Sequence, residues 1–449
     1  MVTMRGGTAA ALEEAETLSS PSSSEANVTL RGDRITRLVK SLKTSATLAQ
    51  RSVIKLLDQK AATFASSTTL WISNQLFIAN ASMELIQRLA LESSIVEIHE
   101  EQSLSMGNSF KEEHFELFEL MSGLDLPLRT NTQAWGVGKI GAEAVWAQGV
   151  IGENVTVGTI DTGVRATHEA LRDNFRGDYG WFDPETKRAE PYDTSGHGTH
   201  VVGSIVGING IGVAPGAKWM TCRGCRSTTS CLESSLLACA QFVLCPTDPE
   251  GENYDCRKAP RIVNNSWGTA RGAANFSAVI AAWRAAEIIP IFAIGNSGSS
   301  KTCSTVESPG EASNVIGVGA TSSEDVLLPQ SSTGPSIDGR VKPDITAPGV
   351  RIYSAWWTRD NVYTITSGTS MAAPHVAGAV ALLLSAKPEL TFEQVWTALT
   401  SAAVRDGNLV KNAAFHSLCG NISASTFPNN IFGYGRVDVQ RAVAAVAGD

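Results

Sequence analysis

The chain has 449 residues, 43% of them apolar and 18% charged, which is an ordinary composition for a globular protein with room for two domains. Its net charge of -8 and pI near 5.5 exclude the basic character typical of proteins that bind nucleic acid. The longest apolar run, 376–384, is shorter than the ~18 residues that a membrane span needs. We therefore expect neither a nucleic acid nor a membrane as a partner.

Two segments precede the largest part of the chain. Residues 1–33 are rich in serine and acidic side chains, and we expect a disordered tail because they bury too little apolar surface to become ordered. Residues 34–101 carry helically spaced apolar side chains, a strand pair at 70–79 and a short strand at 95–98. These patterns together predict a small α+β module.

The rest of the chain consists of a connector and a main domain. The connector, residues 102–130, is polar and acidic and contains an amphipathic piece at 110–120. In the main domain, 131–449, short β-rich runs alternate with helical patterns, which predicts an α/β fold with a parallel sheet covered by helices on both faces. The expected strands are 155–160, 217–222, 261–264, 290–294 and 315–318, and the expected helices are 199–206, 230–242, 275–287 and 371–385.

Cysteine usage is uneven, since six of the eight cysteines fall between 222 and 256 and the other two are Cys303 and Cys419. An even number suits disulfides in an oxidising compartment. A zinc site is the alternative, because Cys222 and Cys225 have the spacing of zinc ligands. We favour disulfides because no second Cys-x-x-Cys pair or nearby histidine completes a tetrahedral set. The connectivity stays open.

This cysteine usage fits a secreted protein, and six Asn-x-Ser/Thr triplets also point to secretion and to a glycoprotein. We expect a monomer. The triplets begin at Asn27, Asn80, Asn154, Asn264, Asn275 and Asn421. Against secretion, the first 11 residues lack the run of ~7–15 apolar residues of a signal peptide. Either the leader is missing from this chain or export is unconventional.

Three segments supply the groups that acyl transfer needs, which are an activated hydroxyl, a base for its proton and a group that orients the base. Asp161 follows the expected strand 155–160, at the strand end where α/β sheets build their sites. His197 stands between glycines at the start of a helix. Ser370 begins the apolar helix 371–385, whose N-terminal dipole favours developing negative charge.

A fourth group would stabilise the oxyanion of the reaction. Asn296 follows the expected strand 290–294, which brings its side-chain amide to the same edge of the sheet. The backbone N–H of Ser370 would be the partner donor. We therefore predict that Asp161, His197, Ser370 and Asn296 are the catalytic residues of a serine peptidase.

These segments resemble the subtilisin-like serine proteases, in which the triad has the same chain order of Asp, His and Ser. The resemblance extends over most of residues 131–446. The motifs are Asp161-Thr162-Gly163, His197-Gly198-Thr199-His200, Asn264-Asn265-Ser266-Trp267-Gly268, Gly295-Asn296 and Gly368-Thr369-Ser370-Met371-Ala372-Ala373-Pro374-His375. Within the family the chain looks most similar to the bacillopeptidase F branch, through Gly180-Trp181-Phe182-Asp183, residues 212–219 and residues 282–286.

The resemblance implies a subtilisin-like three-layer fold and an endopeptidase that cuts proteins or peptides through an acyl-enzyme. It also implies that residues 34–101 are a ferredoxin-like inhibitory propeptide, the chain's own intramolecular partner, whose end near 99–102 would lie in the active site until cut. The enzyme would then be made as a zymogen. Catalysis would need no cofactor and no metal.

By the same resemblance Ser266, Trp267 and Gly268 would form a wall of the substrate cleft, with Gly295 beside it, and an extended peptide would add to this wall as a strand. A plain strand end is the alternative interpretation.

Glu307 aligns with the floor of the family's primary specificity pocket. A carboxylate there would favour Lys or Arg before the scissile bond, unless Glu307 turns out to solvent. The pair Arg129-Thr130 would suit self-maturation by such an enzyme.

Two histidines and one loop remain to be interpreted. We interpret His200 and His375 as packing or capping groups. The family often has a tight calcium site after the helix of the catalytic histidine, but residues 208–212 offer no acidic ligand and no room for ~6–8 oxygen atoms. We expect that site to be absent, whereas weaker calcium sites elsewhere stay open.

Two other classes of protein are kept as alternatives. The chain could be a catalytically silent relative that acts as a binding protein, although all four catalytic positions are filled. An ester hydrolase of another fold is disfavoured, because residues 367–371 lack the Gly-x-Ser-x-Gly elbow and the triad order differs.

Overall fold

The computed structural model describes residues 1–17, 26–106, 134–299, 302–406, 408–409 and 418–447. The amphipathic piece expected at 110–120 and the pair Arg129-Thr130 lie outside the described residues.

The main domain is built around a parallel sheet, with seven strands among the described residues in the order β13-β12-β11-β10-β6-β8-β7. The strands are β6 (Thr156–Asp161), β7 (Trp181–Phe182), β8 (Lys218–Arg223), β10 (Ile262–Asn265), β11 (Ile289–Ala293), β12 (Ile316–Thr321) and β13 (Ile345–Pro348). The five strands expected from the sequence are confirmed. The sequence did not reveal β7 and β13. Strand β7 has only two residues, and β13 has four and ends in proline, so neither shows a β pattern.

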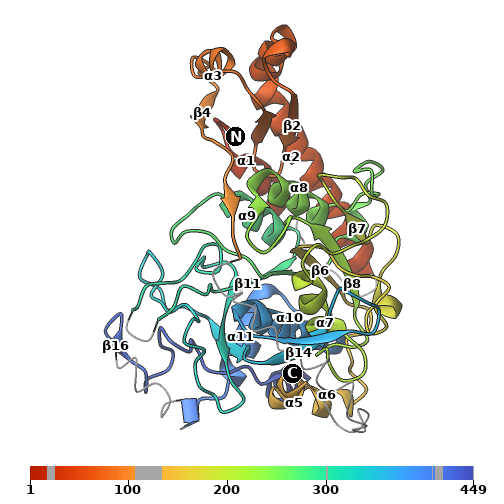
Figure 1. Cartoon of the computed structure of the whole chain (residues 1–449), viewed down its shortest axis with the longest axis vertical. Helices are drawn as coiled ribbons and strands as arrows, with labels where there is room; N and C mark the ends of the chain where they lie inside the picture. The colour runs from red at the N-terminus through yellow and green to blue at the C-terminus, as the bar shows by residue number, and fades with distance from the viewer. Residues whose placement is uncertain (18–25, 107–133, 300–301, 407, 410–417, 448–449) are drawn as a thin grey trace.

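Helices cover both faces of this sheet (Figure 1), which confirms the expected α/β class. Successive side chains of a strand point to opposite faces, so Ile262 joins the core beneath α7 and α10, and Val263 joins the core beneath α8 and α9. The helices of this domain are α5 (Trp135–Lys139), α6 (Ala142–Trp146), α7 (His197–Val206), α8 (Glu233–Leu244), α9 (Ser277–Ala285), α10 (Thr369–Ala386), α11 (Phe392–Ala402) and α13 (Val439–Ala447).

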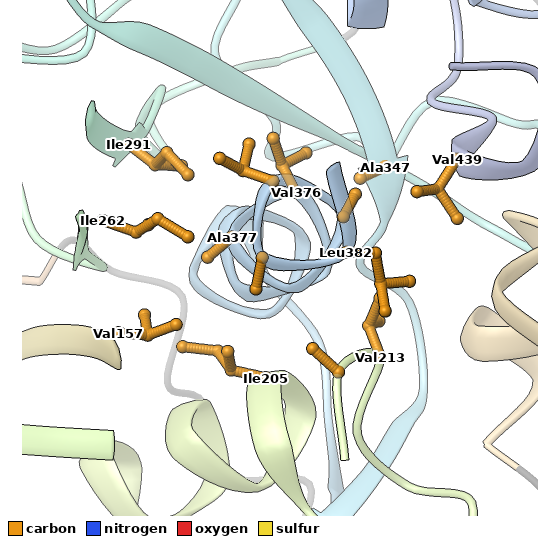
Figure 2. Packing of buried hydrophobic residues seen from close by; sticks show 14 of the residues in the cluster. Val157, Ile205, Val213, Ile262, Ile291, Ala347, Val376, Ala377, Leu382 and Val439 are labelled. Atoms are coloured by element: carbon orange, nitrogen blue, oxygen red, sulfur yellow. The ribbon is translucent and has the colours of Figure 1, made fainter. Parts of the chain in front are cut away.

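Helix α10 passes through the middle of the larger core. Figure 2 shows Val376, Ala377 and Leu382 of this helix surrounded by apolar side chains from the sheet and from α7. Among the described helices, α10 is long and apolar enough to cross a membrane, by length and composition only, and 89% of its 18-residue window is buried inside the protein. Such burial is what a core helix of a globular domain requires.

The N-terminal module is an antiparallel sheet of the order β2-β3-β1-β4 within the described residues. Its elements are β1 (Val2–Met4), α1 (Ala9–Thr17), α2 (Ala26–Gln59), β2 (Ser66–Leu70), β3 (Gln75–Ala79), α3 (Met83–Leu89) and β4 (Ile95–Ile98). The series β1-α2-β2-β3-α3-β4 with this strand order is a ferredoxin-like arrangement.

The disordered tail expected over 1–33 is wrong for the part that the structure describes. Val2 and Met4 are each 2% exposed and lie in β1, between β3 and β4. A three-residue strand is too short to show a pattern, but its alternate side chains complete the core of the module. Helix α1 follows, and α2 then runs for 34 residues.

All eight cysteines are described and paired, so disulfides are confirmed and the zinc alternative is wrong. The pairs are Cys222–Cys239, Cys225–Cys231, Cys245–Cys256 and Cys303–Cys419. Short two-stranded sheets join β5 (Ser103–Leu104) to β9 (Cys231–Leu232), β14 (Ile352–Ala355) to β15 (Tyr363–Thr366) and β16 (Leu418–Cys419) to β17 (Ile422–Ser423). The pair Cys225–Cys231 closes the loop that leads into β9.

The packing of α10 leads to a stability prediction. Leu382 is fully buried, whereas Leu91 of the N-terminal module is 76% exposed. We expect Leu382→Ala to lower the free energy of unfolding by about 2–5 kcal/mol, because it leaves a cavity around the helix. The matched Leu91→Ala should change it by less than about 0.5 kcal/mol. Chemical unfolding of both variants measures this, and equal effects would contradict a rigid core at α10.

Candidate active site

The candidate site lies at the carboxyl edge of the sheet, where β6 stands between β8 and β10. The chain continues from β6 toward β7 and β8 on one side and from β10 toward β11 on the other, which opens a crevice between the ends of β6 and β10. Asp161 is the last residue of β6 and is fully buried. Its Oδ1 accepts hydrogen bonds from the backbone N–H of Thr162 at 2.8 Å and from Nδ1 of His197 at 2.7 Å.

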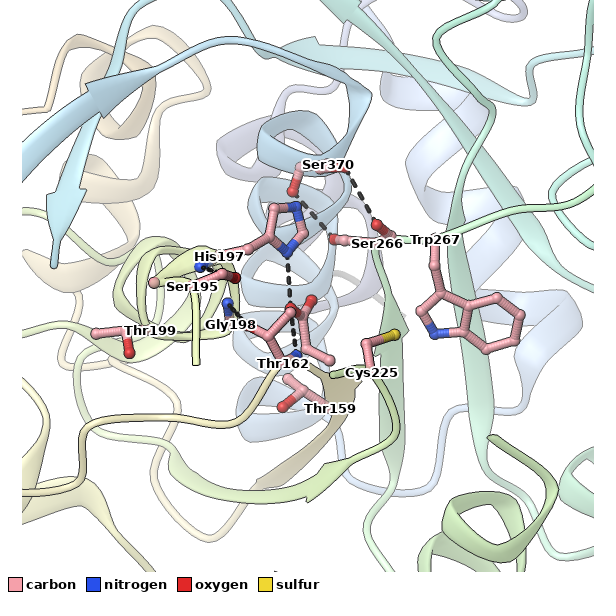
Figure 3. A network of polar contacts seen from close by, with 12 residues as sticks. Thr159, Thr162, Ser195, His197, Gly198, Thr199, Cys225, Ser266, Trp267 and Ser370 are labelled. Carbon is pink, nitrogen blue, oxygen red and sulfur yellow. Dashed lines mark hydrogen bonds and ion pairs between the residues drawn. The ribbon is translucent and has the colours of Figure 1, made fainter. Parts of the chain in front are cut away.

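The bond to Asp161 determines the tautomer of His197. A carboxylate only accepts, so Nδ1 of His197 carries the proton, and Nε2 of the neutral ring is the basic nitrogen. Figure 3 shows the ring lying between this contact and Ser370. The predicted carboxylate, imidazole and hydroxyl are therefore brought together.

Two glycines allow α7 to lie this close to β6. Gly196, the N-cap of α7, has φ +89, and a Cβ there would lie 2.2 Å from Cδ1 of Trp357. A Cβ on Gly198 would lie 2.1 Å from the carbonyl oxygen of Gly163. Any other residue at 198 would push the start of α7 away from the segment that ends β6, and one at 196 would be strained and would collide with Trp357.

Ser370 lies in the first turn of α10, whose N-terminal dipole favours negative charge. Its Oγ donates to the carbonyl oxygen of Ser266 at 3.2 Å, and Oγ of Ser266 donates to the carbonyl oxygen of Ser370 at 3.0 Å. Because Ser266 directly follows β10, these two bonds fasten the start of α10 to the end of a strand. The buried core helix thus presents Ser370 at the sheet edge.

Asn296 lies three residues beyond the end of β11 and contacts the residue before Ser370. Its Oδ1 accepts hydrogen bonds from the backbone N–H and from Oγ1 of Thr369, both at 3.0 Å. The backbone N–H can only donate, so the oxygen of the planar amide faces Thr369 and the NH2 group is directed away from it. The side chain is thereby held beside the start of α10.

Asp193 was not expected from the sequence, yet it joins the segments on either side of the crevice. Its carboxylate accepts hydrogen bonds of 2.6–3.0 Å from Oγ1 of Thr162, the N–H groups of Ser195, Gly196 and Thr199, and Oγ1 of Thr199. It therefore caps α7 and ties this helix to the residue that follows Asp161. The sequence did offer a signal, because acidic residues are common just before the start of a helix and Asp193 stands four positions before His197.

Glu307 is buried with 9% of its surface exposed, so the alternative in which it turns out to solvent is wrong. Its Oε1 accepts hydrogen bonds from Oγ of Ser297 at 2.7 Å and from the N–H of Asn296 at 3.2 Å. A Cβ on Gly268 would lie 2.7 Å from its Oε2, and a Cβ on Gly295 would lie 2.5 Å from its Cδ. Burial raises the pKa of this carboxyl group.

A segment that follows the N-terminal module lies against the end of β10. Strand β5 pairs antiparallel with β9, and Ser105 forms an antiparallel bridge with Gly268. Residues 103–106 thus lie between two backbone edges as an added strand. The resemblance placed residues 99–102 in the active site. In the structure the N–H of Glu233, at the start of α8, donates to the carbonyl oxygen of Gln102, and Ser105 is the residue that reaches Gly268.

The side chain of Trp267 lies in the core. It is 2% exposed, its Nε1 donates to the carbonyl oxygen of Ile160 at 3.1 Å, and its ring packs against Phe276 and Phe292. Figure 3 shows the indole pointing away from His197 and Ser370. Of this residue only the backbone can line a cleft.

His200 and His375 are fully buried, in agreement with our interpretation of them as packing groups. A ring nitrogen of His200 contacts the carbonyl oxygen of Ile352 at 3.0 Å, and Nδ1 of His375 contacts that of Met371 at 2.8 Å. Burial lowers the pKa of His200 to about 3 and that of His375 to about 4. Both rings are therefore neutral at ordinary pH.

The turn after α7 does not fit a calcium ion. Residues 208–212 carry no acidic side chain, and a Cβ on Gly212 would lie 2.2 Å from the backbone nitrogen of Gly207. In the part of the chain that the structure describes, no three His, Cys, Asp or Glu side chains gather to hold a metal.

A carboxylate, an imidazole and a hydroxyl act together on unrelated folds in different chain orders, so the order and the sheet together define the class of protein. Here an Asp-His-Ser order on a parallel α/β sheet defines a serine peptidase of the subtilisin type. Residues 152–435 match the Subtilase family, and the chain belongs to this family of serine endopeptidases.

Curated relatives support this assignment. Bacillopeptidase F of Bacillus subtilis (strain 168) is 32% identical over 436 residues, which cover 91% of this chain and 28% of that protein. Subtilisin DY of Bacillus licheniformis is 34% identical over 281 residues, which cover 62% of this chain and 93% of that protein. Subtilisin E of Bacillus subtilis (strain 168) is 36% identical over 279 residues, which cover 61% of this chain and 67% of that protein. The chain thus spans about a quarter of the length of bacillopeptidase F and most of subtilisin DY.

The buried His375 predicts a pH dependence of stability. Its pKa in the folded protein is about 4, below the ordinary value of 6.5, so the unfolded chain binds the proton first as the pH falls. We expect the free energy of unfolding to drop by roughly 3 kcal/mol between pH ~6.5 and ~4 on account of this group, and then to level off. A His375→Gln variant should lack this part of the decline in chemical unfolding across pH, and identical slopes would contradict it.

Proposed function

We propose that the chain hydrolyses peptide bonds in proteins, with Ser370 as nucleophile, His197 as base and Asp161 as the group that orients the base. The observation that supports this most is the 2.7 Å contact between Asp161 and Nδ1 of His197, at the strand end that faces Ser370. Subtilases need no cofactor for this chemistry.

In the proposed mechanism Nε2 of His197 takes the proton of Ser370 as its Oγ attacks the carbonyl carbon of the substrate. The tetrahedral oxyanion would be stabilised by the NH2 group of Asn296 and the backbone N–H of Ser370. His197 then gives the proton to the leaving amine, which leaves an acyl-enzyme that water hydrolyses. Asp161 stays ionised and stabilises the imidazolium ion.

We also propose that the protein is made as a zymogen. Support comes from residues 103–106, which lie beside β9 and Gly268. If Gly268 lines the substrate cleft, as the resemblance implies, a peptide substrate would have to displace them.

Four disulfides favour folding in an oxidising, extracellular compartment. Glycosylation at Asn264 is incompatible with its complete burial, whereas the other sequons remain candidates.

The assignment of Ser370 is tested by covalent labelling. We expect a fluorophosphonate to label the wild-type chain at Ser370, and Ser370→Ala to lose labelling and to hydrolyse casein at no more than ~10⁻³ of the wild-type rate, because the nucleophile is gone. The matched Ser401→Ala, on an exposed part of α11, should keep both activities. A processed wild-type protein that never reacts with the probe would favour the catalytically silent alternative.

The position of Glu307 supports a preference for basic residues before the scissile bond. Its carboxylate lies close to Gly268 and Gly295, two residues that the resemblance assigns to the substrate cleft. An arginine or lysine entering there would bring a positive charge to a buried negative one. Because burial raises the pKa of Glu307, this attraction would weaken as the pH falls through that raised value.

We therefore expect kcat/KM to be at least ~10-fold higher for peptides with Arg than with Phe at that position, a difference of about 1.4 kcal/mol. The isosteric Glu307→Gln should remove most of this ratio while retaining turnover of the Phe peptide, because the amide oxygen can still accept from Ser297 and Asn296. A peptide library gives both values. A strong preference for Phe or Leu in the wild type would refute the basic pocket.

A further inference from the structure

The first half of α2 extends beyond the sheet of the N-terminal module and lies along the main domain. In Figure 1 this helix runs from the module down the side of the domain, past α8. At the far end of this stretch, Arg31 and Gly32 contact residues that come just before β10 and just after α9.

Arg31 is held by backbone carbonyl groups of the main domain. Its Nη2 donates to the carbonyl oxygen of Pro260 at 2.8 Å, its Nη1 to that of Ala259 at 3.1 Å and its Nε to that of Ala286 at 3.1 Å. Glu287 lies 3.9 Å from Nε. The side chain of Arg31 is only 12% exposed. The three carbonyl oxygens lie in different directions around the planar guanidinium, and the compact ammonium group of a lysine could not donate to all of them in this geometry.

The acceptors explain why a cation belongs at this place. Ala286 is the C-cap of α9, so its carbonyl group lies at the negative end of the helix dipole and has no partner within the helix. Ala259 and Pro260 lie between the short 3₁₀ helix η3 (Cys256–Lys258) and β10. Burial lowers the pKa of Arg31 to about 9, so the group remains charged at neutral pH.

Gly32 makes the close approach of α2 possible. A Cβ on this residue would lie 2.5 Å from Cγ of Arg257 and 3.1 Å from its Cα. The disulfide Cys245–Cys256 attaches η3 covalently to the end of α8. On the side of η3, the surface that receives the helix is therefore covalently braced.

We infer that the end of α9 together with Ala259 and Pro260 is a docking site for the N-terminal module, separate from the substrate cleft. The two contact regions lie at opposite edges of the sheet, since Ala259 and Pro260 precede β10 whereas the cleft lies at the carboxyl ends of the strands. Arg31 thus adds a contact with the main domain that is distant from residues 103–106, beyond the apolar core that the module shares with α8 and α9. Cutting the chain at the cleft alone would leave the module bound. This inference rests on the proposed zymogen.

The test compares Arg31→Ala with Arg51→Ala, which removes the same charge from an exposed position on the same helix. Both are made in the full chain that carries Ser370→Ala, so that the result does not depend on activity. Hydrogen exchange at 103–106 should be roughly tenfold faster in Arg31→Ala, since hydrogen bonds to a charged group are lost, and unchanged in Arg51→Ala. The hairpin at 66–79 should keep its protection in both, which shows that the module stays folded.

A second variant guards against unfolding of the module. Gly32→Ala raises the helix propensity of α2, so an undocked helix would only become more stable. If α2 docks on η3, the added methyl group instead forces the helix off Arg257, and exchange at 103–106 becomes faster. The higher helix propensity of alanine would therefore slow exchange or leave it unchanged, whereas the steric contact with Arg257 would make exchange faster. Unchanged or slower exchange at 103–106 in Gly32→Ala would overturn the inference.

Failure of the inference differs from failure of the proposed function. Equal exchange at 103–106 in Arg31→Ala and Arg51→Ala refutes the docking site, even if the chain with Ser370 labels with a fluorophosphonate. A chain that never labels, but in which Arg31→Ala speeds exchange at 103–106, refutes the peptidase and retains the docking site. If both results are positive, the chain with Ser370 and Arg31→Ala should also label faster than the wild type before processing.

Discussion

The candidate site depends on the fact that all strands of a parallel sheet end at the same edge. Strand β6 places Asp161 there, and the residues after β10 and β11 add Ser266 and Asn296. Helix α10 crosses the core beneath the sheet and meets this edge with its N-terminus, where Ser370 lies. No single segment carries the site. Its geometry is maintained because displacing any one of these ends would expose apolar surface that the sheet and α10 bury together.

Burial also dictates how the charged groups are arranged. Asp161 and His197 have no exposed surface in the full chain, and an ionised group in such a place is costly unless it is hydrogen-bonded. The contacts of Asp161 with His197 and of Asp193 with the start of α7 meet this need. Because Thr162 links the two carboxylates, the orientation of the imidazole is set by backbone as well as by side chains. Little reorganisation is then required when charge develops during catalysis.

Much of this could be predicted from the sequence, because strand ends, glycine pairs and the order of Asp161, His197 and Ser370 are local signals. Strands β6, β8, β10, β11 and β12 were predicted for the same reason, and the disulfide character of the cysteines followed from their even number. What escaped was non-local. Strand β1 is ordered only by its neighbours β3 and β4, and the carboxylate of Asp193 gains its meaning from contacts with two separate segments. Trp267 belongs to a motif of the cleft, yet its ring fills the core, which a motif alone does not reveal.

The loop closed by Cys225–Cys231 has a consequence for the behaviour of the protein in solution. It ends in β9, which has two residues and pairs with β5 in the full chain. Once that partner is removed, a row of backbone groups is left without its neighbour, and open edges of this kind recruit other sheets. An edge of two residues, tied back by a disulfide, can guide one extended peptide but is too short to template a growing stack of strands. If the proposed processing removes β5, the edge of β9 would thus become available to a substrate with little risk of aggregation through it.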